Sequence, residues 1–156
     1  MRKDLPNDTI DIAYRFDNPE LLNQALTHSS IRYEADGSNH GHNQRLEFLG
    51  DAVLGLIIAE HLYFRWPDAR EGELTRMRSI LVQGSTLVQI ARELKLNHYL
   101  VVSAAVRAQG GHEQDAPLED ALEALIGAIY LDGGMQAAGR TVLQWYGDIQ
   151  VRLKQE

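Results

Sequence analysis

The sequence predicts an all-α protein that folds as a single domain over residues 1–156. Helix start and stop signals recur along the chain, and the apolar residues between them have helical spacing. Strand signals are weak, because the one β-branched patch, Tyr99 to Val102, is short. The length suits one domain with a sizeable core.

The first hundred residues contain signals for five helices. Asn18-Pro19-Glu20 combines a capping residue, a proline at the first helical position and an acid in the first turn. A shorter helix is expected before it, capped by Asn7 or Asp8 and ending at Phe16. Residues 34–43 are polar and glycine-rich and predict a loop. Three further helices are expected over residues 46–63, 71–82 and 86–94, the last capped by Ser85.

The last fifty residues predict two helices after a polar loop at 107–116. Pro117 can open the first of them, which should run to Leu131. Asp132-Gly133-Gly134 should stop it, and an amphipathic helix is expected from about Met135 to Leu153.

Composition excludes several functional classes. The net charge is −7, whereas a sequence-blind nucleic-acid binder is normally basic, so any nucleic-acid role must depend on a local site. The absence of cysteine excludes disulfides, thiol catalysis and cysteine-based zinc sites. No apolar run is long enough to span a membrane, and the N-terminus lacks the apolar stretch of a secretory signal. We therefore expect a cytoplasmic protein with no membrane partner.

Acidic residues interrupt two otherwise apolar helices. Glu47 and Asp51 are the only charged residues between positions 46 and 59, and their spacing of four places them on one face. The surrounding apolar residues cover most faces, so this helix should be largely buried. In the helix after Pro117, both Glu119 and Asp120 can share a face with Glu123, and the spacing does not choose between them.

Two helices that each present a carboxylate pair predict a site made of oxygen ligands. Such ligands suit Mg²⁺, which can activate water and stabilise charge on a phosphoryl oxygen. The residues alone therefore favour Mg²⁺-dependent hydrolysis of a phosphate ester. The alternative is purely structural, with Glu47 paired to Arg45 or Arg76 and Asp51 acting as a cap.

Basic residues offer weaker candidates. His28, near a helix end, could contact a phosphate, although a structural histidine is the more common case at such a position. Arg76 and Arg78 could meet a nucleic-acid backbone, but a spacing of two directs them to different faces.

Four segments together identify a family. They are QALTHSS at 24–30, NQRLEFLGDAVL at 43–54, EGELTRMR at 71–78 and DALEALIG at 120–127. In order and spacing they resemble the catalytic domain of ribonuclease III, and the resemblance covers essentially the whole chain. It implies an all-α homodimer whose two active sites lie along a valley that accepts double-stranded RNA.

The resemblance assigns roles to the acids. It implies that Glu47, Asp51, Asp120 and Glu123 bind Mg²⁺, with Mn²⁺ expected to substitute, and it selects Asp120 over Glu119. Glu47 and Glu123 would be direct ligands, while Asp51 and Asp120 would complete the shell. Each subunit would cut one strand, leaving a 5′-phosphate, a 3′-hydroxyl and a short 3′ overhang, in the processing of rRNA, mRNA or small RNA. No organic cofactor is implied.

Three further positions match the family outside the acid cluster. Phe48 matches an aromatic residue that packs into the partner subunit. Gln44 and Glu71 match an accessory acidic subsite that affects cleavage position and efficiency. Gln44 departs from the usual glutamate, so metal binding at that subsite is in doubt.

Two other departures concern RNA binding. Relatives often have basic residues in the loop before Asp120, where this chain has His112-Glu113-Gln114-Asp115. Many bacterial relatives continue into a double-stranded-RNA-binding domain, and none is present in these 156 residues. With a net charge of −7, RNA affinity should be weak and steeply salt-dependent.

Two other functional classes compete with a ribonuclease. An all-α nucleotide pyrophosphohydrolase also binds Mg²⁺ with helical acid pairs, but the segment around Glu47 argues against it. A catalytically silent dimerisation or RNA-binding module would have the same fold. Such modules usually lose acids, whereas all four are present here.

Overall fold

The computed structural model describes residues 9–31 and 41–154, and every regular element in them is helical. Seven α-helices and two short 3₁₀ helices follow one another: α1 (Pro19–Ala25), α2 (Gln44–Arg65), α3 (Glu71–Val82), α4 (Gly84–Glu93), η1 (Leu96–His98), α5 (Ala104–Ala108), η2 (Gly111–Glu113), α6 (Asp115–Tyr146) and α7 (Ile149–Leu153). One isolated parallel bridge joins Thr27 to Val101. The predicted all-α class is therefore confirmed.

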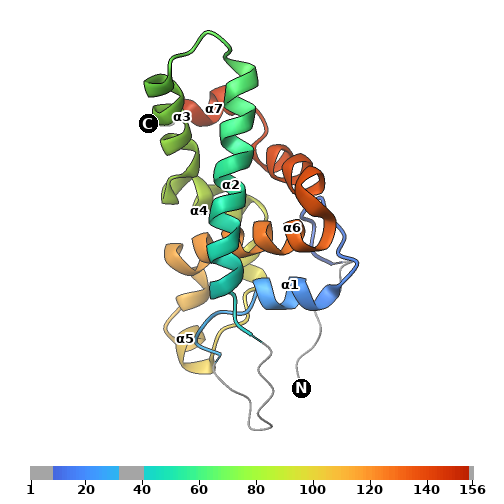
Figure 1. Ribbon diagram of the computed structural model, residues 1–156. Helices are drawn as coiled ribbons and strands as arrows, with labels where there is room; N and C mark the ends of the chain where they lie inside the picture. The colour runs from blue at the N-terminus through green and yellow to red at the C-terminus, as the bar shows by residue number, and fades with distance from the viewer. Residues whose placement is uncertain (1–8, 32–40, 155–156) are drawn as a thin grey trace.

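The long helices α2 and α6 cross at the centre of the molecule (Figure 1). Glycines form the crossing point. A Cβ atom on Gly50 would overlap the carbonyl oxygen of Glu123, and one on Gly127 would overlap the carbonyl oxygen of Leu46. Because neither glycine carries a side chain, the two backbones touch. Residues 121–129 of α6 are all buried, and the helix packs against α1, α2 and α4.

The break predicted at Asp132-Gly133-Gly134 is confirmed. Gly134 has a φ of 86° and a ψ of 177°, which interrupts α6 and changes its direction (Figure 1). The predicted continuation to Leu153 is wrong. The chain leaves the helix at Gly147, where φ is 64°, and then forms α7.

The helix predicted to end at Phe16 is also wrong. Asn7 and Asp8 lie outside the described residues, and residues 9–16 are not helical. Ile10 and Ile12 are buried at a spacing of two, which suits an extended segment rather than a helix. The indole nitrogen of Trp145 donates a hydrogen bond to the Ile12 carbonyl at 2.7 Å and fixes the segment on α6.

Most other boundaries agree with the sequence. α1 begins as predicted, because the side chain of Asn18 accepts a hydrogen bond from the backbone N–H of Glu20 at 3.1 Å. α3 has the predicted bounds. α4 starts earlier than expected, with Gln83 rather than Ser85 at the cap position. Of the predicted loop at 34–43, only residues 41–43 are described.

No helix in the described part of the chain is both long and apolar enough to cross a membrane.

Candidate active site

The crossing of α2 and α6 brings the acids of both helices together. On α2, Glu47 and Asp51 lie one turn apart on the face that meets α6. Glu47 shares a hydrogen bond with Asp120, and Asp51 shares one with Glu123. The acids therefore meet in two pairs across the helix crossing, each pair with one member from each helix. The contact between Gly50 and Gly127 makes this approach possible.

Burial and mutual repulsion raise the pKa values of these acids. Glu123 is 7% exposed, and burial, with the nearby charges of Asp51 and two glutamates, raises its pKa to about 8. Burial, with the charge of Asp120, raises the pKa of Glu47 to about 7. Burial also raises the pKa of Asp120. In the absence of a cation, the cluster therefore favours protonated carboxyl groups over a full set of carboxylates.

No arginine or lysine neutralises this charge among the described residues. None of the ion pairs found there includes Glu47 or Asp51. Arg45 and Arg76, the partners in the structural alternative, are both exposed. The structure therefore does not support that alternative.

Glu119 borders the cluster without joining either pair. Its carboxylate lies at the first turn of α4, where a Cβ atom on Gly84 would come within 2.8 Å of it. Burial, with the charge of Asp120, raises the pKa of Glu119. The spacing left open whether Glu119 or Asp120 faces the α2 pair, and in the structure Asp120 does.

The donor set fits a hard divalent cation. All the polar groups contributed by the two pairs are carboxyl groups, and their raised pKa values show that the ionised forms are unfavourable unless a cation stabilises them. No group of three or more His, Asp or Glu side chains in the described residues already forms a metal cage. Mg²⁺ does not need one, because it usually keeps several waters and takes one or two protein carboxylates.

The loop before α6 uses its acids to contact α4. The guanidinium of Arg92 donates to the Asp115 carboxylate at 3.0 Å and to the Glu113 carbonyl at 2.8 Å. The side-chain amide of Asn97 donates to the Glu113 carboxylate at 3.0 Å. Glu113 and Asp115, at positions where the chain departs from the family pattern, thus fix the loop before Asp120 to Arg92 and Asn97.

The structure does not bring Gln44 and Glu71 together within one chain. Gln44 begins α2, whereas Glu71 begins α3 beyond the other end of α2. A helix of 22 residues separates them, a distance of about 30 Å. The two can therefore form one subsite only if different copies of the chain contribute them.

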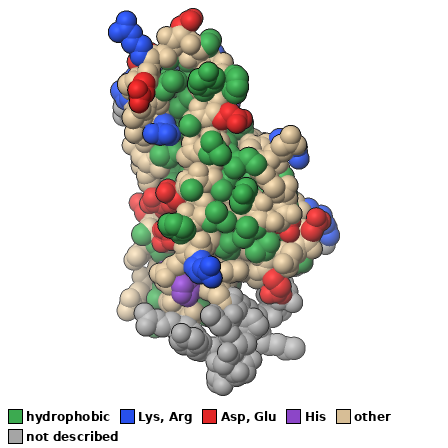
Figure 2. Space-filling view, viewed as in Figure 1, with side chains coloured by type: hydrophobic (Ala, Val, Ile, Leu, Met, Phe, Trp, Pro, Cys, Tyr) green, Lys and Arg blue, Asp and Glu red, His purple; other side chains and the backbone are tan. Residues whose placement is uncertain are grey.

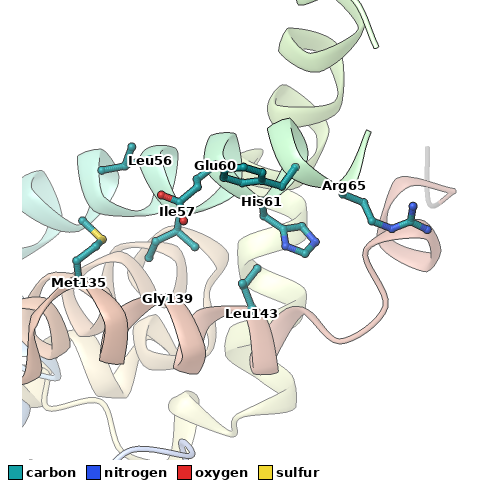
Figure 3. Close-up of a pocket in the computed structure, with 9 residues that line it drawn as sticks. Leu56, Ile57, Glu60, His61, Arg65, Met135, Gly139 and Leu143 are labelled. Atoms are coloured by element: carbon teal, nitrogen blue, oxygen red, sulfur yellow. The ribbon is translucent and has the colours of Figure 1, made fainter. Parts of the chain in front are cut away.

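The expectation that α2 is largely buried is wrong. Phe48 is 83% exposed, and Leu56 and Phe64 are exposed on the same helix. Hydrophobic side chains gather along α2 and the second half of α6 (Figure 2). A groove of about 360 Å³ lies between these helices, with Leu56 and Ile57 on one side and Met135 on the other (Figure 3). The apolar residues on all faces of α2 indicated that the helix is buried, but they did not show which surface covers each face.

A comparison with known families places the chain in a family. Residues 18–148 match the family described as Ribonuclease-III-like. The chain belongs to this family. The family resemblance expected from the four segments is therefore confirmed.

Curated ribonuclease 3 proteins are similar over most of the chain. The protein from Oleidesulfovibrio alaskensis is 53% identical over 132 residues, which cover 85% of this chain and 57% of that protein. The protein from Vibrio cholerae is 46% identical over 138 residues, covering 88% and 58%. The chain thus spans less than two thirds of the length of these relatives.

Solved structures of a ribonuclease III nuclease domain and of a Dicer are similar to this chain in fold. The nuclease domain of ribonuclease III from Campylobacter jejuni has a TM-score of 0.80 and 37% identity, covering 93% of this chain and 92% of that one. A second structure of that domain is described by flexibility in a region involved in dimer formation. Dicer from Pichia stipitis has a TM-score of 0.66 at 27% identity, covering 99% of this chain and 62% of that one.

Proposed function

We propose that this chain is a nuclease domain that hydrolyses phosphodiester bonds of double-stranded RNA with Mg²⁺. The observation that carries the proposal is the meeting of two carboxylate pairs at the α2–α6 crossing, in a domain of the ribonuclease-III-like family. The products would be ends with a 5′-phosphate, a 3′-hydroxyl and a short 3′ overhang. A cytoplasmic location and a role in rRNA, mRNA or small-RNA processing stay predictions.

Each acid has a part that its position supports. Glu123, the most buried, would hold the metal from α6, and Glu47 would hold it from α2. Asp51 and Asp120, each hydrogen-bonded to one of these glutamates, would orient them or hold metal-bound waters. When bound, Mg²⁺ would activate water and stabilise charge on the phosphate, and Mn²⁺ should substitute for it. Asp51 is exposed, so the RNA strand would approach from its side.

We further propose that two copies of the chain associate through the exposed apolar face of α2. Phe48, exposed to 83%, and Leu56, exposed to 53%, are both on α2, and Leu56 also lines the groove beside Met135. A two-fold dimer is self-complementary, so an aromatic residue on one copy can fill a groove on the other. Two sites would then face one RNA duplex, one for each strand. Gln44 of one copy and Glu71 of the other could also share a subsite.

The test is cleavage of a long, end-labelled RNA duplex at low salt, with Mg²⁺ and with EDTA. Single-stranded RNA and duplex DNA serve as substrate controls, and a nucleoside triphosphate tests the pyrophosphohydrolase alternative. We expect Mg²⁺-dependent cutting of duplex RNA alone, with 5′-phosphates on the products. Binding of the duplex without cutting would instead indicate a silent module.

A further inference from the structure

His28 differs in charge type from the other residues that act on the acid cluster. Among the described residues whose charge shifts the pKa of Glu47, Asp120 or Glu123, His28 is the one base. It acts on Asp120, whose pKa it lowers against the larger effect of burial. All the other charges that act on these three groups come from acids.

The turn that carries His28 is fixed to the segment before α5. The backbone N–H of His28 donates to the Val101 carbonyl at 2.8 Å, and the N–H of Val101 donates to the Leu26 carbonyl at 2.8 Å. The hydroxyl of Ser30 accepts a hydrogen bond from the N–H of Ser103 at 2.9 Å. These bonds hold the turn on both sides of the histidine.

The same turn also anchors the start of α2. The N–H of Asn43 donates to the Thr27 carbonyl at 2.9 Å, and the Asn43 side-chain amide donates to the Ala25 carbonyl at 3.1 Å. The N–H of Glu47 in turn donates to the Asn43 carbonyl at 2.8 Å, in the first turn of the helix. The turn that carries His28 is therefore joined through Asn43 to the first turn of α2, where Glu47 lies.

Local hydrogen bonding determines which ring nitrogen of His28 is a donor. The N–H of Ser30 donates to Nδ1 of His28 at 3.0 Å, so Nδ1 is the unprotonated nitrogen of the neutral ring and Nε2 carries the proton. No hydrogen bond or ion pair between Nε2 and a described residue is found, and His28 is half-buried.

We propose that Nε2 of His28 donates a hydrogen bond to a non-bridging phosphate oxygen of the RNA strand bound at the acid cluster. This inference rests on the proposed function. The acids repel a phosphodiester, and Mg²⁺ held by them would offset that repulsion and help to orient the phosphate. A donor on the fixed turn of His28 would add a second contact to the phosphate. Since it contacts the backbone and not a base, it adds no sequence preference.

Two substitutions separate this role from a structural one. His28→Asn keeps an acceptor near the Nδ1 position for Ser30 but cannot reach the Nε2 position. His28→Gln places an amide donor near the Nε2 position. We expect kcat/KM on duplex RNA to fall about tenfold in His28→Asn, the loss of one hydrogen bond to a charged group, and to recover partly in His28→Gln. Mg²⁺ affinity, measured by calorimetry without RNA, should stay unchanged in both variants.

A spectroscopic measurement tests the proposal independently of cleavage. The ¹⁵N resonances of the His28 ring, recorded in a Glu123→Gln background with Mg²⁺, should show the Nε2–H tautomer. Nε2–H should shift when a short RNA duplex is added, while Nδ1 should not. This measurement needs only the folded chain and the duplex, so it decides the role of His28 even if His28→Asn fails to fold or the wild-type chain does not cut.

The outcomes distinguish the two proposals. A wild-type chain that does not cut overturns the proposed function, whereas unchanged kcat/KM in His28→Asn beside an active wild type overturns only the role of His28. A parallel loss of Mg²⁺ affinity in His28→Asn would also overturn it, because His28 would then merely support Asp120. An Nε2 resonance that does not shift when the duplex is added would also overturn the role of His28.

Discussion

Glu123 combines deep burial with a carboxylate that has no basic partner among the described residues. We predict that Glu123→Gln leaves the fold intact but abolishes cleavage, because an amide is a poor substitute for a carboxylate on Mg²⁺. With EDTA at pH 8, the variant should be more stable than the wild type by about 1 kcal/mol, because a buried repulsion is removed. Thermal unfolding and the duplex assay measure the two effects.

A charge-matched variant provides the control for this prediction. Glu20 lies in the exposed first turn of α1, far from the cluster in sequence. Glu20→Gln removes the same charge and should retain wild-type cleavage. Cleavage by Glu123→Gln at the wild-type rate would refute the role assigned to Glu123.

The raised pKa values also predict how stability depends on pH. Glu47 and Glu123 have folded-state pKa values of about 7 and about 8, above the unfolded value of about 4.3 for a glutamate. The folded state therefore binds more protons than the unfolded state in this window, and stability is lost as pH rises from about 5 to 8. Urea unfolding with EDTA should show this decrease.

Mg²⁺ should remove most of this pH dependence, because a bound cation stabilises the ionised carboxylates.

The loss of stability with rising pH does not come from Asp132, whose pKa is lowered by hydrogen bonds from Tyr14 and two backbone N–H groups. Asp132 therefore stabilises the fold above the pKa that it has in the unfolded chain, and this contribution is lost only at lower pH. Stability that rises between pH 5 and 8 with EDTA would contradict the arrangement of the acids.

At the scale of elements, the α2–α6 crossing sets the spacing of the acids. We predict that Gly127→Ala destabilises the chain by about 1–3 kcal/mol, because the new methyl group overlaps the carbonyl of Leu46. The helices must separate, so Mg²⁺ affinity should fall together with stability. Calorimetry and urea unfolding of the same variant measure both quantities.

Gly72 offers a matched control on α3. It is exposed, and a Cβ atom there would meet nothing within 4 Å. Gly72→Ala should therefore be neutral or stabilise the helix by about 0.5–1 kcal/mol, with Mg²⁺ affinity unchanged. If Gly127→Ala behaved in the same way, the glycine contact would not determine the position of the acids.

At the scale of the whole molecule, the exposed face of α2 predicts the oligomeric state. A charge at Phe48 would have to be buried in the proposed dimer, so Phe48→Glu should give a monomer by light scattering at micromolar concentration. Duplex cleavage should fall with it, because the proposed arrangement of two sites along one RNA duplex needs both copies. Val151→Glu, on the exposed side of α7, should remain dimeric.

A monomeric wild-type chain at the same concentration would count against the dimer. A dimeric Phe48→Glu variant would instead move the interface away from this face of α2, and the groove beside Met135 would then need another explanation.

Local sequence signals predicted elements well where they agree with the packing. Asn18 caps α1 through its side chain, and α3 occupies the predicted residues. The same kind of signal failed before Phe16, because burial of Ile10 and Ile12 against α6 favours an extended segment over a capped helix. Capping contributes about 1 kcal/mol, and the burial of two isoleucines outweighs it.

The sequence by itself determined the all-α class, the family and the helix faces that carry the acids. Those properties depend on residue type and on spacing along a helix, which are local. Spacing along the helix left Glu119 and Asp120 open and only the family resemblance favoured Asp120, whereas the tertiary structure places Asp120 against Glu47, because the direction of each side chain depends on how α6 lies across α2. It alone also separated Gln44 from Glu71 and left Phe48 exposed, since distances between helices and the surfaces left uncovered follow from packing, not from spacing along the chain.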